Sequence, residues 1–369
     1  MPYAQRLYFE HAKTGRGAHY EIAVRKHLLV TSAWLALIYL AVTVIGYAAG
    51  RTVYWNLAVP ALLLLVLQTQ LTGTFTFLEA ERRYRSLTVA QSLFKILQVP
   101  CLIVLLQLTI CAPTAIIGAQ VVAVASVIAL WGRRSRRVER SRVAAEGFTT
   151  KEVAQSAAAS FGWSVYLMTA FSWLLSTSDR YVIDYFLSSG EVGVYSVNYG
   201  LWSMPYLMLN AALELTIRSR VFQRAETADW AGVRTLILAR LTISVALGLI
   251  GTGLLYLIGP KVAALVIGVP YRRGTELMLL IAGAHAFYAA GISYYSVFVS
   301  AKRVAVMVPI MAAACVLNVV LNVLLISQLG IIGAAWSTLI TFSAMGVFLL
   351  IAGERLLSAL INQSRQQVA

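Results

Sequence analysis

Charged side chains are scarce in this sequence. Asp, Glu, Lys and Arg make up 12% of the 369 residues, whereas hydrophobic residues make up 59%. A soluble domain carries about 25% charged residues, so a soluble core could not hide this much apolar surface, but a bilayer can. In hydrocarbon only helices and closed barrels satisfy every backbone hydrogen bond. Apolar runs such as 61–67 and 245–250 do not alternate as barrel strands do, so the sequence predicts an all-α transmembrane helix bundle.

Cysteines and catalytic motifs are also lacking. Cys101, Cys111 and Cys315 fall in apolar stretches with no CxxC spacing and no neighbouring histidine, and we interpret them as packing residues. The sequence has no HExxH, GxSxG, P-loop or GxGxxG motif. The loops expected outside the membrane are short, and their acids are scattered. The sequence therefore predicts no enzyme activity, no cofactor and no metal site.

Acidic residues are half as frequent as basic ones, 15 against 30, which gives a formal net charge of +15. Nucleic-acid binding is not predicted, because the basic residues stand between apolar runs rather than on one soluble face. Ten runs approach the length of about 20 residues that spans a bilayer. They are 28–49, 54–77, 88–110, 113–131, 154–176, 192–215, 235–258, 276–298, 304–326 and 332–353.

The basic residues also predict the orientation of the chain. With the N-terminus in the cytoplasm, only Arg51, Arg180, Lys261, Arg272 and Arg273 fall on the outer side, as the positive-inside rule requires. We therefore expect ten spans in a bacterial inner membrane, with both ends cytoplasmic. The expected domains are an N-terminal lobe of four spans (1–131), a basic cytoplasmic linker (132–151) and a C-terminal lobe of six spans (152–369).

The most distinctive segment is SDRYVIDYFLSSGEVGVYS, residues 178–196. It combines an Asp-Arg pair at the end of one span, a short extended connection and a Gly-x-x-Gly-x-Tyr start to the next span. This segment resembles the hairpin between the seventh and eighth helices of the oligosaccharide flippases. They are the O-antigen flippase-like, polysaccharide transporter branch of the multidrug/oligosaccharidyl-lipid/polysaccharide exporter (MOP) superfamily.

Two further stretches carry the same resemblance. GIIGAAWST, residues 330–338, resembles the start of the family's last core helix, and residues 318–325 resemble the helix before it. The family usually has twelve to fourteen helices in two lobes of six. Here YAQRLYFE, residues 3–10, resembles the cytoplasmic segment that follows the family's second helix. The resemblance thus implies an incomplete N-terminal lobe that lacks the first two helices.

Polar side chains that repeat along one face of a span favour a lined cavity. Together with the Asp-Arg pair, they are the candidate substrate-binding residues. These candidates are Arg180, Asp179, Lys95, Gln91, Gln98, Tyr195, Tyr199, Tyr206, Asn210, Asn318 and Asn322.

Each candidate also has a structural interpretation. Lys95 can extend its amine to the inner interface, and Asn318 can form a hydrogen bond between helices. Arg180 can form a helix-end ion pair with Asp179. Glu214, which continues the tyrosine stripe, can pair with Arg218 four residues later.

The resemblance implies that the chain flips an oligosaccharide linked to polyprenyl diphosphate from the inner to the outer leaflet, by alternating access between two lobes. This activity serves the synthesis of lipopolysaccharide and other cell-surface polysaccharides. A diphosphate in hydrocarbon needs cationic and hydroxyl partners, which Arg180, Lys95 and the tyrosines can supply. The expected partners are this substrate, membrane lipid, and a polysaccharide polymerase or a second copy of the chain.

Three other functions stay open at this point. One is a cation-coupled small-molecule exporter of the same superfamily, although that branch usually holds its coupling carboxylate in the first helices. Another is a membrane sugar polymerase or ligase, which the absence of a large outer loop disfavours. The last is an inactive, truncated flippase.

Overall fold

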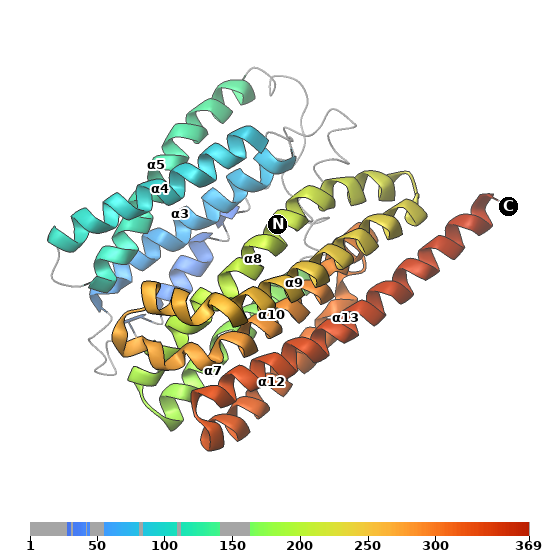
Figure 1. Ribbon diagram of the computed structural model, residues 1–369. Helices are drawn as coiled ribbons and strands as arrows, with labels where there is room; N and C mark the ends of the chain where they lie inside the picture. The colour runs from blue at the N-terminus through green and yellow to red at the C-terminus, as the bar shows by residue number, and fades with distance from the viewer. Residues whose placement is uncertain are drawn as a thin grey trace. The chain divides into compact units, whose positions relative to one another are not determined.

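The computed structural model describes residues 28–30, 32–41, 43–44, 55–80, 84–108, 112–140 and 163–368. These residues form helices joined by short turns, and none of them lies in a strand, so the predicted all-α class is confirmed. The chain separates into two compact units, Met1–Ser160 and Phe161–Ala369 (Figure 1). The lobe boundaries inferred from sequence stay a prediction.

The first unit contains α3 (Trp55–Ala80), α4 (Tyr84–Leu108) and α5 (Ala112–Arg140), and α5 packs against both other helices. Buried Leu71, Ala90, Val124 and Val127 form its core. The segment 132–151 was expected to be a polar linker, but its first part continues α5 as far as Arg140. The rest of that segment lies outside the described residues.

The second unit, which we call the C-terminal unit, contains six helical passes, two of them interrupted or preceded by 3₁₀ turns. Its helix α10 packs against α8, α9 and α13, while α12 packs against α7 and α13. The elements are α7 (Trp163–Phe186), α8 (Ser189–Glu226), α9 (Trp230–Val266), η3 (Val269–Leu277), α10 (Met278–Gly291), η4 (Ile292–Tyr294), α11 (Tyr295–Ser300), η5 (Val304–Val306), α12 (Met307–Leu329) and α13 (Ile331–Val368).

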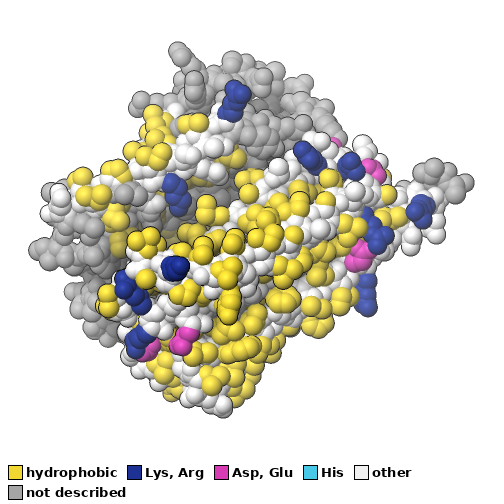
Figure 2. Space-filling model, viewed as in Figure 1, with side chains coloured by type: hydrophobic (Ala, Val, Ile, Leu, Met, Phe, Trp, Pro, Cys, Tyr) yellow, Lys and Arg dark blue, Asp and Glu magenta, His cyan; other side chains and the backbone are white. Residues whose placement is uncertain are grey.

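The surface of the C-terminal unit is apolar. Leu249 is 71% exposed and Leu257 is 69% exposed, both on α9. Figure 2 shows hydrophobic side chains along the length of this unit, with charged side chains gathered toward its two ends. A soluble protein rarely exposes such an area, whereas in a bilayer lipid covers it.

Five helical segments among the described residues are long and apolar enough to cross a membrane: Arg85–Leu105, Trp230–Val266, Val269–Ser300, Val304–Leu329 and Ile331–Gln366. Shorter apolar helices occupy Leu28–Ala41, Val59–Phe75 and Thr114–Leu130. The predicted spans 154–176 and 192–215 overlap α7 and α8, which are helical but more polar. The chain is a multi-pass membrane protein, and the full number of ten spans stays a prediction.

The connection between α7 and α8 differs from the expected hairpin. No extended segment follows Asp179 and Arg180, because α7 continues through them to Phe186. The side chain of Ser188 accepts a hydrogen bond from the backbone N–H of Glu191 at 3.3 Å and caps the start of α8. A serine followed three residues later by a glutamate is a helix-start signal. The turn therefore lies between Phe186 and Ser189, rather than directly after the Asp-Arg pair.

The turn between α12 and α13 explains the glycines of the GIIGAAWST segment. Gly330 has φ of 64°, a left-handed conformation that glycine adopts without steric cost. A Cβ atom on Gly333 would lie 2.2 Å from the carbonyl oxygen of Leu325. Both positions therefore require glycine so that α12 and α13 can pack closely as an antiparallel pair.

The predicted span 276–298 is an interrupted helix rather than a continuous one. Helix α10 ends at Gly291, and the 3₁₀ turn η4 separates it from α11. A Cβ atom on Gly291 would lie 2.4 Å from the Cα atom of Gly346 on α13. Interruptions of this kind inside membranes occur where the backbone is buried in protein or lines a cavity.

Candidate functional site: a polar cavity in the C-terminal unit

Two groups of polar residues occur in the C-terminal unit, and the first joins α7, α12 and α13. The hydroxyl of Ser178 donates to Oδ1 of Asn318 at 2.8 Å, and Nδ2 of Asn322 donates to the same oxygen at 3.0 Å. The hydroxyl of Ser337 donates to the backbone carbonyl of Asn318 at 3.1 Å. All four side chains are buried. We call this group the Asn318 cluster.

Arg180 lies next to this cluster, and its guanidinium contacts residues of α7 and α8. Its Nε donates to the hydroxyl of Ser196 at 3.0 Å, and its Nη1 donates to the backbone carbonyl of Ser176. The carboxylate of Asp179 lies 3.6 Å from Nη1, and the Tyr199 ring centroid lies 5.2 Å from the guanidinium carbon. These contacts tie α7 to α8.

Aromatic rings continue from Arg180 toward the centre of the unit. Tyr195 and Tyr199 are buried on α8, with ring centroids 5.6 Å apart. The ring of His285 packs against Tyr199, Tyr288 and Phe342, edge to face in each case. Neither ring nitrogen of His285 has a hydrogen-bond partner among the described residues.

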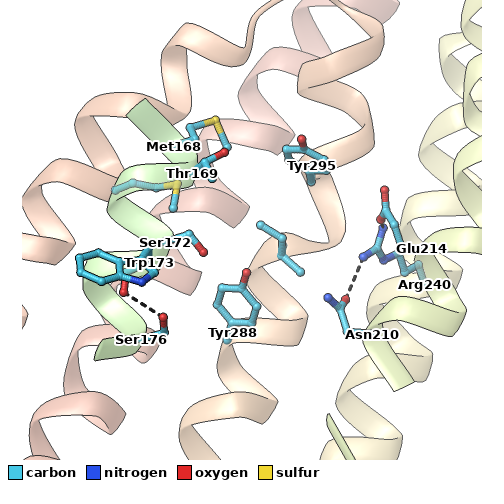
Figure 3. Close-up of a pocket in the computed structure, with 12 residues that line it drawn as sticks. Met168, Thr169, Ser172, Trp173, Ser176, Asn210, Glu214, Arg240, Tyr288 and Tyr295 are labelled. Atoms are coloured by element: carbon cyan, nitrogen blue, oxygen red, sulfur yellow. Dashed lines mark hydrogen bonds and ion pairs between the residues drawn. The ribbon is translucent and has the colours of Figure 1, made fainter. Parts of the chain in front are cut away.

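The second polar group lines a cavity of about 500 Å³. In Figure 3 the side chains of α7 lie on one side, Asn210, Glu214 and Arg240 lie on the other, and Tyr288 and Tyr295 lie between them. The interruption η4 contributes Ile292 to the wall, so the broken helix borders the cavity. The lining residues are Met168, Thr169, Ser172, Trp173, Ser176, Asn210, Glu214, Arg240, Tyr288, Ile292, Tyr295 and Met311.

An ion cluster forms one wall of this cavity. The side chain of Arg240, on α9, is 0% exposed, and its Nη1 contacts Oε2 of Glu214 on α8. Its Nη2 donates to Oδ1 of Asn210 at 3.0 Å. Arg218 lies one turn further along α8, with its Nε 3.5 Å from Oε1 of Glu214. The predicted pairing of Glu214 with Arg218 is confirmed, and Arg240 is a second partner.

The carboxylate of Glu214 thus contacts two guanidinium groups, those of Arg240 and Arg218. The buried Nε–H of Arg240 has no hydrogen-bond partner among the described residues. Unpaired buried donors are costly, so such a group favours an acceptor that enters the cavity. Thr169, Ser172 and Ser176 of α7 line the opposite side of the cavity, where the Ser176 hydroxyl donates to the backbone carbonyl of Trp173 at 2.9 Å.

No protein-family model and no curated protein matches this sequence. Solved structures do match. The Vibrio cholerae MATE transporter VcmN in its bent form aligns with a TM-score of 0.74 at 12% identity, over 97% of this chain and 84% of its own. MATE in the straight conformation gives a TM-score of 0.75 at 14% identity, over 97% and 82%. The outward-facing structure of a multidrug resistance MATE family transporter of the MOP superfamily gives 0.74 at 14%, over the same shares.

The chain has the fold of the MATE transporters. Identities of 12 to 15% establish the fold and nothing finer. The fold expected from the resemblance is confirmed at this level. Neither the flippase branch nor the substrate follows from these matches.

Within the MATE fold, the predicted site residues separate into several places. Asn210 is the one predicted residue that lines the cavity. Asp179, Arg180, Tyr195 and Tyr199 lie together where α7 meets α8, and Asn318 and Asn322 form the adjacent cluster. The hydroxyl of Tyr206 bonds to Thr252 on α9 at 2.8 Å.

The other three predicted residues belong to α4 in the first unit. The amine of Lys95 lies 5.2 Å from the centroid of the Phe94 ring. The side chains of Gln91 and Lys95 are exposed, and that of Gln98 is half-buried. The binding role of every predicted residue stays a prediction.

The residue that sequence reasoning missed is Arg240. It was counted with the basic residues of the inner loops, because it lies near the start of an apolar run. Its position inside α9, ten residues after the helix begins at Trp230, was the available signal. An arginine this deep in a membrane helix needs a buried partner, and in the structure that partner is Glu214.

Proposed function

We propose that this chain is a flippase for an oligosaccharide linked to polyprenyl diphosphate. The observation that carries the proposal is the buried guanidinium of Arg240 in the cavity wall, whose Nε–H has no hydrogen-bond partner among the described residues. A diphosphate diester is a compact dianion, and arginine is the residue best suited to bind its oxygens.

The fold and the motifs support the same proposal. Transporters with the MATE fold move solutes across membranes, and the GIIGAAWST segment forms the tight α12–α13 turn. The hydroxyl groups on α7 match the hydrogen-bonding needs of a sugar. We propose a bacterial inner membrane as the location, because the basic residues concentrate on one predicted side.

A second candidate function is the export of small cations, since one matching structure is described as a multidrug resistance transporter. The cavity gives this candidate less support. Its one described carboxylate, on Glu214, already binds two arginines, so it has little capacity to bind a further cation.

The test is transport by the full chain in liposomes. A fluorescent oligosaccharide on polyprenyl diphosphate is placed in both leaflets, and a lectin added outside captures the molecules of the outer leaflet. With wild type the inner-leaflet molecules should also become captured over time, and with Arg240→Gln they should not. Expulsion of a cationic dye without movement of the glycolipid would overturn the proposal and favour the exporter.

A further inference from the structure

The broken helix α10–η4–α11 forms part of the cavity wall, so a movement at its interruption would change the cavity. The backbone N–H of Tyr295 bonds to the carbonyl of Ile292, three residues back instead of four. A 3₁₀ stretch of this kind inside a helix often marks a hinge. Both residues line the cavity, and Tyr288 lines it one turn earlier. The contacts that hold this interruption therefore help to set the shape of the cavity.

Tyr294, at the end of η4, holds the interruption against α13. Its hydroxyl donates to Oε2 of Glu354 on α13 at 2.7 Å. Its ring lies directly on the backbone of α13, since a Cβ atom on Gly353 would be 2.4 Å from the ring carbon Cγ. Tyr294 is buried. A buried tyrosine needs a partner for its hydroxyl, and Glu354 supplies that partner.

Arg234 of α9 binds the same carboxylate. Its Nη2 lies 2.5 Å from Oε1 of Glu354, and the hydroxyl of Ser358 donates to that oxygen at 3.4 Å. Glu354 thus joins α9, α13 and the interruption. The side chains of Arg234 and Glu354 are 47% and 33% exposed. Ion pairs with this much exposure contribute little to the stability of a whole domain, so we expect the contact to act locally, by orienting Glu354 toward Tyr294.

We propose that Tyr294 and Glu354 form a latch that positions the cavity wall, with Arg234 orienting the carboxylate. While the latch is closed, the interruption lies against α13 and keeps Ile292 and Tyr295 in place. Because Glu354 is partly exposed, water can replace Tyr294 on its carboxylate, and the interruption can then move without unfolding of the unit. The latch lies wholly inside the C-terminal unit, and it does not depend on which molecule the cavity accepts.

Two buried serines allow the latch to be tested by thiol modification. Ser296 lies on α11, two residues after Tyr294, and Ser244 lies on α9. Neither hydroxyl has a hydrogen-bond partner among the described residues, so a cysteine can replace either serine without breaking a described side-chain hydrogen bond.

The experiment uses the full chain in detergent micelles, with its three native cysteines replaced by alanine. One protein carries Ser296→Cys and the other carries Ser244→Cys, and each reacts with a water-soluble methanethiosulfonate. The modification rate of the Ser296→Cys protein reports opening of the broken helix beside Tyr294. The rate of the Ser244→Cys protein is the matched control for loosening of the whole unit.

Tyr294→Phe removes the hydroxyl and keeps both the ring and the pair of Arg234 with Glu354. A hydrogen bond to a carboxylate is strong enough that its loss should raise the modification rate of the Ser296→Cys protein about tenfold. The rate of the Ser244→Cys protein should not change. Equal acceleration in both proteins would mean that the variant loosens the whole unit. An unchanged rate with Ser296→Cys would mean that the bond does not hold the interruption, and either result overturns the latch.

Variants of Glu354 test whether the two side chains act as one contact. Glu354→Ala removes the acceptor, so it should match or slightly exceed the effect of Tyr294→Phe, and the two changes together should cause no further increase. Glu354→Gln keeps an oxygen for Tyr294 but loses the charge that binds Arg234, and it should raise the rate about threefold. Glu191→Gln breaks the pair of Glu191 with Arg273, which are 2.8 Å apart outside the cavity, and should leave the rate unchanged. Effects of Tyr294→Phe and Glu354→Ala that multiply, or acceleration by Glu191→Gln, would overturn the latch.

Discussion

Among the arginine–carboxylate pairs of the C-terminal unit, those of Arg180 and Arg240 have different surroundings. Arg180 pairs with Asp179, and its guanidinium also binds Ser196, the backbone of Ser176 and the ring of Tyr199. Arg240 pairs with Glu214 and Asn210, but it borders a cavity and keeps an N–H without a partner among the described residues. The first pair joins two helices, whereas the second faces a space that a ligand can enter.

The difference shows that the presence of an arginine inside a membrane protein does not identify a binding site. Every buried charge in hydrocarbon needs compensation, so both pairs satisfy the same electrostatic requirement. The two arginines differ in whether the guanidinium keeps a buried N–H that a ligand could bind. The contacts of Arg180 favour a structural role, and the contacts of Arg240 favour a binding role.

The largest expected effect comes from Arg240→Ala. The change leaves Glu214 with one partner inside the unit, and breaking a buried ion pair costs about 3–5 kcal/mol. It also removes the donors proposed to bind the diphosphate, so transport per folded molecule should fall at least about 100-fold. Unfolding in a denaturant series and the liposome assay measure the two effects separately.

The double variant Arg240→Gln with Glu214→Gln sharpens this result. It removes both charges of the pair and leaves two amides that can bond to each other. Part of the lost stability should therefore return, although Arg218 also loses its carboxylate partner. Transport should not return, because the guanidinium is still absent. Recovery of transport together with stability would assign Arg240 a purely structural role.

Arg180→Ala should show the opposite balance of effects. It removes the contacts to Ser196, Ser176 and Tyr199, and the free energy of unfolding should fall by about 2–3 kcal/mol. Transport per folded molecule should change less than about threefold, and Arg180→Lys should restore part of the stability. A normally folded alanine variant without transport would instead support the binding role predicted from sequence.

Asn318→Ala tests the polar group beside Arg180. The substitution leaves Ser178 and Asn322 without their shared acceptor, whereas Ser337 keeps its bond to the backbone carbonyl of residue 318. A lost buried hydrogen bond with an orphaned group costs about 1–3 kcal/mol. We expect a loss of about 2 kcal/mol in thermal or denaturant unfolding. Ser327→Ala, which removes an exposed local bond on the same helix, is the control and should be nearly neutral.

The smallest expected effect comes from Gly291→Ala at the end of α10. The added methyl group would press on Gly346 at 2.4 Å and push α10 away from α13 beside the cavity. Overpacking of this kind costs about 1–3 kcal/mol. Gly253→Ala on α9, where nothing lies within 4 Å, is the matched control and should leave stability unchanged or slightly raised. Equal effects of the two changes would contradict the close α10–α13 contact.

Sequence patterns predicted the helices better than their ends. The apolar runs identified helical segments, because length and hydropathy alone decide whether a segment can cross a bilayer. The end of α7 was misplaced, since the Asp179–Arg180 pair was taken to mark a helix terminus. In the structure the pair is compensated by groups of α8, so the helix can continue past it to Phe186.

The site was predicted less well than the fold. The stripe that includes Asn210 and Glu214 pointed toward the cavity, and the i,i+4 pair of Glu214 with Arg218 was found from spacing. The partnership of Glu214 with Arg240 joins residues 26 positions apart on two helices. No periodicity within one helix can reveal such a contact, because it depends on how α8 and α9 face each other.

The sequence by itself determined that this protein is a helical membrane protein. Its apolar content is too high for a soluble core, and its basic residues lie in short segments between apolar runs. It also determined the glycines of the α12–α13 turn, which a local backbone conformation and a close approach require. Only the tertiary structure decided which charges are structural and which face a cavity. Those roles depend on contacts between distant segments, where burial and competition for partners set the energy of each group.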